Sequence, residues 1–134
     1  MKREIFVVGA ALIQDNRVLC AQRSAQMSLP LHWEFPGGKI EPGESEVAAL
    51  SRELREELGI EAKIGERIAQ LKYEYDFGIV NLSVYWAVIL AGTPVATEHS
   101  ELKWCTVAQM QELNWAPADL PIIENFSLEN FIVS

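Results

Sequence analysis

Runs of apolar residues broken by short polar segments dominate the chain and are typical of β-strands. Turn-forming residues separate neighbouring runs, at 14–16 after the first run and at 77–78 between the third and the fourth. We therefore predict two antiparallel hairpins and a further short strand. The predicted strands are residues 4–13, 17–22, 68–75, 80–90 and 102–105.

The segment 45–58 instead has a helical pattern, because Ala, Leu, Glu and Arg dominate it. Gly59 follows directly and suits the left-handed residue that often ends a helix. We predict two shorter helices nearer the carboxyl terminus: Thr106 can cap one that ends at Leu113, and Pro121 can occupy the first turn of another. The last helix would carry Ile122, Ile123, Phe126 and Leu128.

Residues 29–43 contain three prolines and three glycines around a few bulky side chains, a composition that predicts an irregular loop. Functional residues are often found in such loops, because a rigid scaffold positions them. The predicted strands outnumber the helices, and one amphipathic helix cannot bury its apolar stripe alone. We therefore predict an α+β fold in which helices pack on the faces of a mixed β-sheet.

The chain of 134 residues is long enough to bury one compact core, and we predict a single domain that spans residues 1–134. Its two cysteines, Cys20 and Cys105, lie far apart and form no CxxC pair, which disfavours a zinc site or a disulfide framework. A reduced cytoplasm is the compartment that fits best. No apolar run reaches the roughly 20 residues that a membrane-spanning helix needs, so we expect no membrane association.

The formal net charge of −8 disfavours binding to nucleic acid polymers, because that binding depends on basic side chains that release counterions. We therefore expect no nucleic acid partner. For an acidic protein to hold a smaller polyanion, metal ions must mediate the contact.

The predicted helix 45–58 carries three acids on one face. At about 100° per residue, Glu57 lies at about +40° and Glu56 at about −60° from Glu53. Like charges at this spacing destabilise a helix by a few tenths of a kcal/mol per pair, so their clustering favours a compensating cation. Hard oxygen ligands select Mg²⁺ or Mn²⁺. The adjacent face is apolar and should pack on the sheet through Val47, Leu50, Leu54 and Leu58.

Acid-rich helix faces are also common as ordinary solvated surface, where Arg52 and Arg55 could pair with neighbouring glutamates. The longer string GKIEPGESEVAALSRELREELGI, residues 38–60, favours metal binding because it resembles the signature of the Nudix hydrolase family. Many fixed identities at fixed spacing are far more specific than a lone glycine motif. The matching positions are Gly38, Glu44, Arg52, Glu53, Leu54, Glu56, Glu57, Gly59 and Ile60.

The resemblance extends beyond this string. AQR at 21–23 and WEFPGGK at 33–39 are similar to MutT-type nucleoside triphosphate pyrophosphohydrolases. WAPADLPIIENF at 115–126 is similar to the segment beside the base pocket in MutT-like enzymes and bacterial CTP pyrophosphohydrolases. The resemblance implies the Nudix fold, an α/β/α sandwich whose central mixed sheet is flanked by helices.

The resemblance also implies a metal site. Glu53, Glu56 and Glu57 would bind Mg²⁺, for which Mn²⁺ could substitute, and the backbone carbonyl of Gly38 would be a further ligand. Arg52 would orient the acids by ion pairing.

Two further acids belong to the same expected machinery. Glu44 would support the helix entry through the macrodipole. Glu98 precedes the strand 102–105, where MutT-like enzymes place another metal-linked carboxylate, although Glu101 could fill this role instead. The general base that takes a proton from water would be Glu53 as first candidate or Glu98 as second.

Arg23 and Lys39 are the cations expected to contact phosphate, since Arg can grip two phosphate oxygens while Lys acts as a point charge. Either could instead be a solvated surface cation. His32 and His99 belong to no recognisable spacing, so both are interpreted as solvated loop residues without a role.

Base recognition would involve aromatic side chains and one acid. Phe35, Tyr75 and Trp115 could offer faces to a nucleobase, although aromatic residues at strand positions more often belong to the core. Asp119 stands where MutT has Asn. An ionised Asp accepts from donors such as the cytosine amino group or N1 and N2 of guanine, and a protonated one also donates. Asp119 could equally cap the last helix.

Together these features predict a Mg²⁺-dependent pyrophosphohydrolase that converts a modified or non-canonical (d)NTP and water to a (d)NMP and pyrophosphate. The likeness to MutT implies attack at the β-phosphorus, and the resemblance implies 8-oxo-dGTP, CTP or 5-methyl-dCTP as substrate in nucleotide-pool sanitation and DNA repair. We expect a monomer or a homodimer.

Two alternatives stay open. One is another Nudix substrate, such as ADP-ribose, a dinucleoside polyphosphate or capped RNA. The other is a non-catalytic sensor with the Nudix fold, in which the glutamates of the signature would be lost. None of them is lost here.

Overall fold

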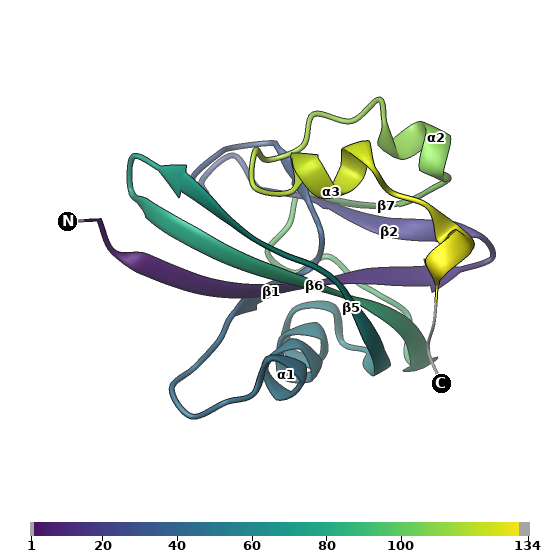
Figure 1. The fold of residues 1–134 in the computed structure, drawn as a ribbon. Coiled ribbons are helices and arrows are strands. Elements are labelled where there is room, and N and C mark those ends of the chain that lie inside the picture. The colour runs from purple at the N-terminus through teal and green to yellow at the C-terminus, as the bar shows by residue number, and fades with distance from the viewer. Residues whose placement is uncertain (1, 132–134) are drawn as a thin grey trace.

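The computed structural model describes residues 2–131, which form a seven-stranded mixed sheet with helices on both faces (Figure 1). The strands are β1 (Glu4–Gln14), β2 (Arg17–Gln22), β3 (Trp33–Glu34), β4 (Gly37–Lys39), β5 (Glu61–Tyr75), β6 (Gly78–Ala91) and β7 (Glu101–Cys105). The helices are α1 (Glu46–Leu58), α2 (Val107–Met110) and α3 (Leu120–Glu124), with a 3₁₀ turn at Leu128–Asn130. This arrangement confirms the predicted α+β class. Within residues 2–131, no helix is long and apolar enough to cross a membrane.

Strand β1 links the two parts of the sheet. It pairs in parallel with β6 from Glu4–Ile79 to Leu12–Ala87, and β6 pairs antiparallel with β5. The other edge of β1 pairs first with β4 and then with β2, which in turn pairs with β3 and β7. The chain therefore crosses from the β2 side of the sheet to β1 between β3 and β4, through Phe35 and Pro36.

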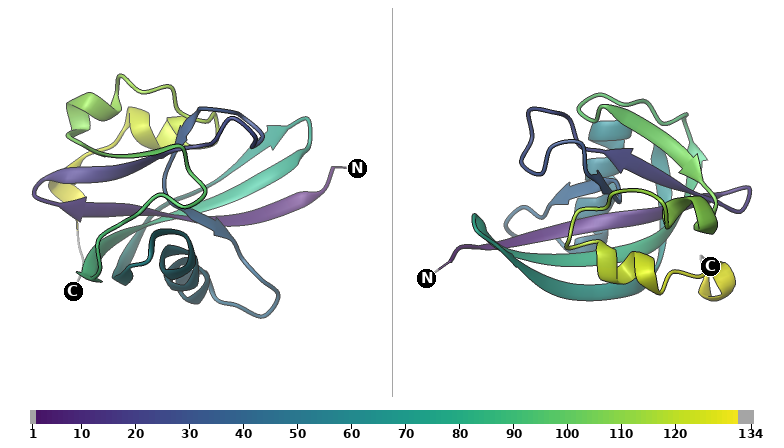
Figure 2. Two further views of the ribbon diagram at one scale, coloured as in Figure 1. Left: turned by 180° about the vertical axis from the view of Figure 1, so that it is seen from behind. Right: turned by 90° about the horizontal axis from the view of Figure 1, so that it is seen from above.

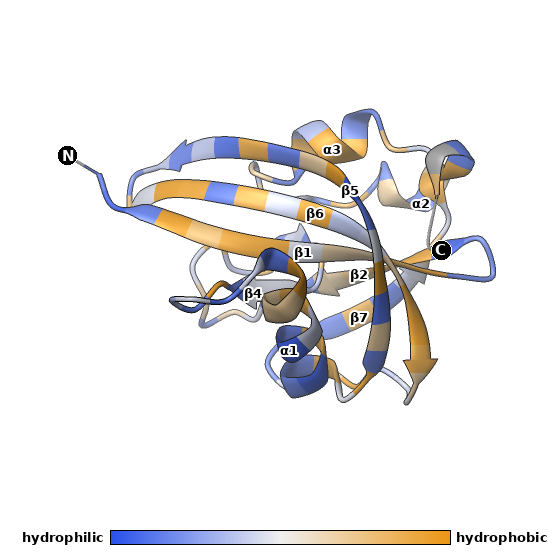
Figure 3. Cartoon of the chain, turned by 60° about the horizontal axis from the view of Figure 1, so that its bottom comes forward, coloured by the Kyte–Doolittle hydropathy of each residue, from blue (hydrophilic) through white to orange (hydrophobic). Residues whose placement is uncertain are grey.

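Two hydrophobic cores lie on opposite faces of the sheet, because successive β1 side chains point to opposite sides. Ala11 and Ile13 pack in the core that α2 and α3 cover, whereas Val8, Ala10 and Leu12 pack in the core that α1 covers. Figures 1 and 2 show α1 on one side of the sheet and α2 and α3 on the other. Figure 3 shows the corresponding apolar residues along β1 and β6. The inner strands are thus buried on both faces, which explains the continuous apolar run in β1.

Helix α1 begins and ends as predicted. The Ser45 hydroxyl accepts from the Ala48 backbone N–H at 3.1 Å, and Gly59 is left-handed, with φ of 70°. The buried face consists of Ala49, Leu50, Leu54 and Leu58.

The prediction that Val47 packs on the sheet is wrong, because this side chain is 44% exposed. In the first turn Glu46 faces the sheet instead. Its carboxylate accepts from the Ser83 hydroxyl at 3.1 Å and from the Tyr85 hydroxyl at 2.6 Å.

Segment 29–43 is not wholly irregular, since β3 and β4 lie within it and pair with β2 and β1. Strand β5 begins at Glu61, earlier than predicted, because irregularities between Ile64 and Ala69 interrupt the alternation that marks a strand. The last helices are shorter than predicted: α2 ends at Met110 and α3 at Glu124. Phe126 and Leu128 therefore lie beyond α3, although Phe126 remains in the core.

Candidate active site

Arg52 on α1 joins the helix to the loop before it through one ion-pair network. Its guanidinium donates to the two Glu44 oxygens at 2.8 and 2.9 Å, to Glu53 at 2.9 Å and to Glu56 at 3.1 Å. It also donates to the Lys39 carbonyl at 3.1 Å. The hydrogen bonds from Arg52 lower the pKa of Glu44 to about 2, so this carboxylate stays charged and holds the loop on the helix.

Glu53 and Glu57, one helical turn apart, bring their carboxyl groups together. Burial, followed by the neighbouring Glu53 charge, raises the pKa of Glu57 to about 8. Within residues 2–131, Glu57 Oε2 is buried without a hydrogen-bond partner. Gly38 lies against Glu53, since a Cβ at Gly38 would overlap its carboxylate. Two crowded acids, one of them with a buried and unpartnered oxygen, fit a divalent cation, which prefers such hard ligands.

The other two predicted carboxylate ligands lie further out. Glu56 is exposed and paired with Arg52, and Glu98 is exposed, although its charge contributes to the raised pKa of Glu57. In the part of the chain that the structure describes, no three acidic, histidine or cysteine side chains converge as a metal cluster. Two carboxylates such as Glu53 and Glu57 match the chemistry of Mg²⁺, which is often held by one or two carboxylates and keeps several waters.

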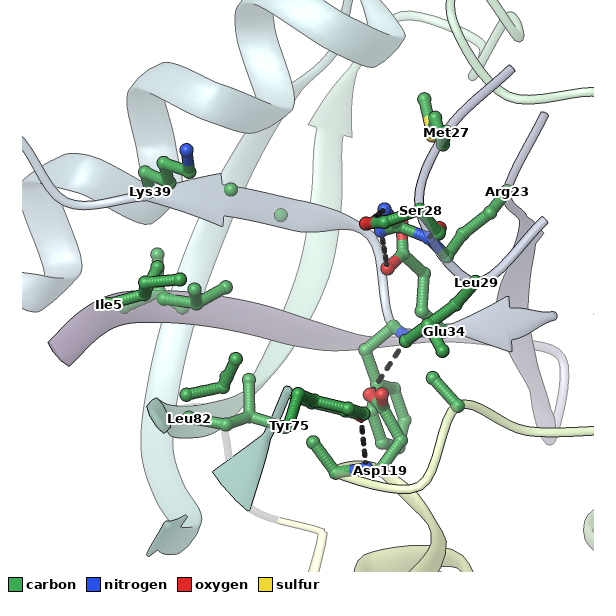
Figure 4. A pocket seen from close by; sticks show the side chains of 18 of the residues that line it. Ile5, Arg23, Met27, Ser28, Leu29, Glu34, Lys39, Tyr75, Leu82 and Asp119 are labelled. Atoms are coloured by element: carbon green, nitrogen blue, oxygen red, sulfur yellow. Dashed lines mark hydrogen bonds and ion pairs between the residues drawn. The ribbon is translucent and has the colours of Figure 1, made fainter. Parts of the chain in front are cut away.

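A cavity of about 710 Å³ extends from this acidic corner along the face of the sheet that α3 covers (Figure 4). Its volume suits a small-molecule ligand. Among the predicted residues, Arg52, Glu56 and Glu98 do not line it. The predicted residues that do are Gly38, Lys39, Glu53, Glu57, Arg23, Phe35, Tyr75 and Asp119. Sequence reasoning missed other residues of its wall, among them Arg3, Ile5, Met27, Leu29, Glu34 and His99.

Asp119 lies across the cavity from Lys39 (Figure 4). Its side chain caps no helix, because its own backbone is already helical, at φ −85° and ψ −25°, and the capping alternative is wrong. Asp119 Oδ1 instead accepts from the Phe35 backbone N–H at 3.4 Å. Burial, and then the charge of Glu34, raises the pKa of Asp119 well above its ordinary value, so this acid can be protonated and can donate as well as accept.

Glu34 is the cavity acid that the sequence analysis missed. It accepts from Arg23 Nη1 at 2.8 Å (Figure 4). The position of Glu34 between Trp33 and Phe35 in WEFPGGK was the feature of the sequence that could have indicated its role. Trp33 and Phe35 are both buried, and side chains alternate along a strand, so the carboxylate of Glu34 points away from theirs.

His99 is not a solvated loop residue, so that interpretation is wrong. It is 8% exposed, lines the cavity, and places Nε2 at 2.9 Å from Glu34 Oε2. The two residues are 65 positions apart, and a contact of this separation leaves no local pattern. His32, in contrast, does not line the cavity, and its Nδ1 lies 3.1 Å from the Pro30 carbonyl.

The three candidate aromatic residues differ in their access to the cavity. Trp115 is 4% exposed and donates from Nε1 to the Met110 carbonyl at 2.7 Å, so it belongs to the core. Phe35 packs on Trp115 with ring centroids 5.4 Å apart and is also 4% exposed. Tyr75 is partly exposed and stacks on Phe77 at 4.9 Å, which makes it the aromatic wall most open to a ligand.

The two expected phosphate contacts have different surroundings. Arg23 donates to the carbonyl and hydroxyl of Ser28 at 2.6 and 3.0 Å, in addition to its bond with Glu34. Three of its five N–H donors are therefore engaged. Lys39 is exposed on β4 at the acidic end of the cavity. Contact of either residue with phosphate stays a prediction.

A family model described as the NUDIX domain matches residues 4–126. The chain is 45% identical over 122 residues to the CTP pyrophosphohydrolase of Escherichia coli K12, with 91% of this chain and 90% of that protein covered. It is 30% identical over 123 residues to the 8-oxo-dGTP diphosphatase of the same organism, with 92% and 95% covered.

Solved structures agree with these matches. The crystal structure of the MutT protein from Methanosarcina mazei Go1 superposes with a TM-score of 0.84 at 28% identity, and 96% of each chain is covered. The resemblance in residues 38–60 is thus confirmed, and so is the α/β/α sandwich that it implied. The chain belongs to the Nudix family.

Proposed function

We propose that this protein is a Mg²⁺-dependent nucleoside triphosphate pyrophosphohydrolase that converts a modified or non-canonical (d)NTP and water to a (d)NMP and pyrophosphate. The observation that carries the proposal is a single cavity lined by Glu53 and Glu57 and also by Glu34 and Asp119. The first pair suits a metal-bound triphosphate, and the second suits the polar edge of a base. The names of the two Escherichia coli relatives support the same reaction class.

Glu53, Glu57 and the Gly38 carbonyl would hold the metal, with Glu56 and Glu98 as further candidate ligands. When bound, Mg²⁺ or Mn²⁺ polarises phosphate oxygens and lowers the pKa of water. The buried, unpartnered Glu57 oxygen and the contact between Gly38 and the Glu53 carboxylate support this assignment.

Other residues of the chain would orient these groups and move the proton. Arg52 holds Glu53 and Glu56 in place by hydrogen bonds of 2.9 and 3.1 Å. Glu53 is the first candidate for the general base because it lines the cavity, and Glu98 is the second. Arg23 and Lys39 are the candidate contacts for phosphate oxygens.

The base would lie at the end of the cavity that contains Asp119 and Glu34, beside Tyr75. A charged Glu34 can accept from a base N–H, and a protonated Asp119 can donate to a neighbouring ring nitrogen or carbonyl. Cytosine offers N4–H beside N3, and guanine offers N1–H beside O6, so both CTP or 5-methyl-dCTP and 8-oxo-dGTP fit this pair.

A substrate panel with product identification tests the proposal. CTP, 5-methyl-dCTP, 8-oxo-dGTP, the ordinary dNTPs and ADP-ribose are each incubated with the protein and Mg²⁺. We expect at least one of the first three to be cleaved faster than the ordinary dNTPs, with release of the monophosphate and pyrophosphate. If all triphosphates stay intact while ADP-ribose is cleaved, the proposal is wrong. The Glu53→Gln protein, purified in parallel, excludes a contaminating hydrolase.

The reaction would serve nucleotide-pool sanitation, and thereby DNA repair, in the cytoplasm. The protein would act as a monomer or a homodimer, without a nucleic acid or membrane partner. The net charge of −8 supports a small nucleotide rather than a polymer as the ligand. Cys20 and Cys105 are buried free thiols, which supports a reducing compartment.

A further inference from the structure

The Glu34 carboxylate is held from two sides. Oε1 accepts from Arg23 Nη1 at 2.8 Å, and Oε2 lies 2.9 Å from His99 Nε2. Because a different partner holds each oxygen, the plane of the carboxylate is fixed as well as its position. The side chain of Glu34 is 22% exposed and that of His99 is 3% exposed, so His99 is the more deeply buried partner in this contact.

We propose that His99 is a positioning residue for base recognition: its Nε2–H holds Glu34 in the orientation in which the carboxylate accepts a hydrogen bond from the nucleobase. The inference rests on the proposed function, since it assigns the base to the cavity end that contains Glu34. It adds a residue that acts through Glu34, and not by contact with the substrate.

The hydrogen-bond chemistry gives the direction of this contact. An ionised carboxylate can only accept, so Nε2 of His99 carries the proton and donates to Glu34. Within residues 2–131, the other ring nitrogen, Nδ1, is buried without a partner. Burying an imidazole whose Nδ1 has no partner costs free energy. The hydrogen bond between Nε2 and Glu34 offsets part of that cost.

The loop that carries His99 is fixed at both ends of the site. Ser100 donates from its backbone N–H to the Gln22 carbonyl at 2.9 Å, and its hydroxyl donates to Gln22 Oε1 at 2.7 Å. Thr97 donates from its hydroxyl to the Glu57 carbonyl at 2.8 Å. The His99 ring is therefore presented from a loop tied to both β2 and α1, which gives it a defined position from which to orient Glu34.

Glu34 and the buried acid of the base end line the same cavity, and this makes the orientation of Glu34 relevant to recognition. Asp119 accepts from the backbone N–H of Phe35, the residue next to Glu34, and the Glu34 charge acts on Asp119. The two acids therefore act on the same small region of the cavity. A carboxylate free to rotate would lose its alignment with a base edge even if its charge were retained.

A matched pair of substitutions separates this role from simple filling of space. The terminal amide of His99→Gln can reach Glu34 in place of Nε2–H, whereas His99→Asn keeps a polar amide that is too short to do so. His32→Gln is the control, because His32 does not line the cavity. His99→Leu, an apolar side chain of similar reach, replaces the Asn variant if that protein does not fold, as judged by thermal unfolding.

Two ligands report on the two ends of the cavity. The nucleoside monophosphate of the best substrate reports on the base end, and inorganic pyrophosphate with Mg²⁺ reports on the acidic end. We expect His99→Asn to raise KM, and the Kd of the monophosphate, by about tenfold, the effect of losing a hydrogen bond to a charged group, with kcat within about twofold. Inhibition by pyrophosphate should not change. His99→Gln and His32→Gln should resemble the wild type.

The inference is wrong if His99→Asn binds the monophosphate normally, or if His99→Gln is as impaired as His99→Asn. It is also wrong if inhibition by pyrophosphate and the Mg²⁺ dependence change as much as KM, because His99 would then support the acidic end. If the wild-type protein binds the monophosphate but cleaves no triphosphate, the proposed function alone is refuted. The Kd of the monophosphate, measured by calorimetry, still tests the role of His99 in that case. A protein that does neither refutes both.

Discussion

At the scale of single residues, the surroundings of each acid give it a different protonation behaviour. Glu44 accepts two hydrogen bonds from Arg52, and its pKa falls to about 2. Glu57 is buried beside Glu53, and its pKa rises to about 8. Asp119 is buried near Glu34, and its pKa is also raised. Carboxyl side chains thus provide a fixed anion, a candidate metal ligand and a candidate hydrogen-bond donor to the base.

The acids at the metal end should be essential for turnover and dispensable for folding. We expect Glu53→Gln and Glu57→Gln each to lower kcat by two or more orders of magnitude, because each removes a charged candidate ligand. Thermal unfolding should show that both variants remain folded. Glu112→Gln is the control, since Glu112 is exposed in the turn after α2 and does not line the cavity. Near-native rates in the first two variants would contradict the proposed metal site.

The raised pKa of Glu57 predicts how metal-free protein responds to pH. Its value is about 8 in the folded protein against 4.5 for an ordinary Glu, so the folded state binds the proton more tightly. The resulting stabilisation is fully present below about pH 4.5 and is lost as the pH rises through about 8. With chelator present, Tm should therefore fall from about pH 5 to about pH 8.5, and Mg²⁺ should restore it at the higher pH.

The raised pKa of Asp119 also makes Tm fall as the pH rises. Glu57→Gln removes the contribution of Glu57 and leaves that of Asp119 unchanged, so the variant isolates the effect of Glu57. The fall in Tm between the two pH values should be smaller in Glu57→Gln than in the wild type. Equal slopes in the two proteins would show that Glu57 does not bind the proton as described.

At the scale of elements, α1 was the most predictable part of the protein because its signals are local. Ser45, Gly59 and the leucine stripe are all readable from adjacent positions. Strand β5 was predicted only in part, since its bulges hide the alternation and its full length depends on pairing with β6. Strands β3 and β4 are too short to show a pattern of their own, and β4 is also rich in glycine. Only pairing with β2 and β1 makes them strands.

Two glycines before α1, one in β4 and one in the loop that follows it, have different effects on the helix acids. A Cβ at Gly38 would overlap the Glu53 carboxylate, whereas a Cβ at Gly43 would meet no atom within 4 Å, although φ there is +83°. We expect Gly38→Ala to lower kcat at least tenfold by displacing Glu53. Gly43→Ala should instead cost about 1 kcal/mol of stability, from its left-handed backbone, and leave kcat unchanged. Turnover and denaturant unfolding of both variants check this, and equal rates would contradict it.

At the scale of the whole molecule, the sheet brings together residues that are distant in the sequence. Glu34, Glu53, His99 and Asp119 lie on four separate segments and line one cavity. The signature in residues 38–60 predicted the acidic end, because those residues lie within one loop and one helix. The base end could be predicted only in part. The contacts of Glu34 with His99 and of Asp119 with Phe35 span 65 and 84 positions, and they arise only from the packing of the sheet.

The central claim is that one cavity holds a triphosphate at its acidic end and a base at the other, so that water attacks phosphorus and releases pyrophosphate. Turnover of the best substrate in ¹⁸O-labelled water, followed by ³¹P NMR, tests it most directly. With Mg²⁺ present, we predict a nucleoside monophosphate without label and pyrophosphate that carries one ¹⁸O, the result of attack at the β-phosphorus. A nucleoside diphosphate with orthophosphate as the products, or turnover that persists without a divalent metal, would contradict the account.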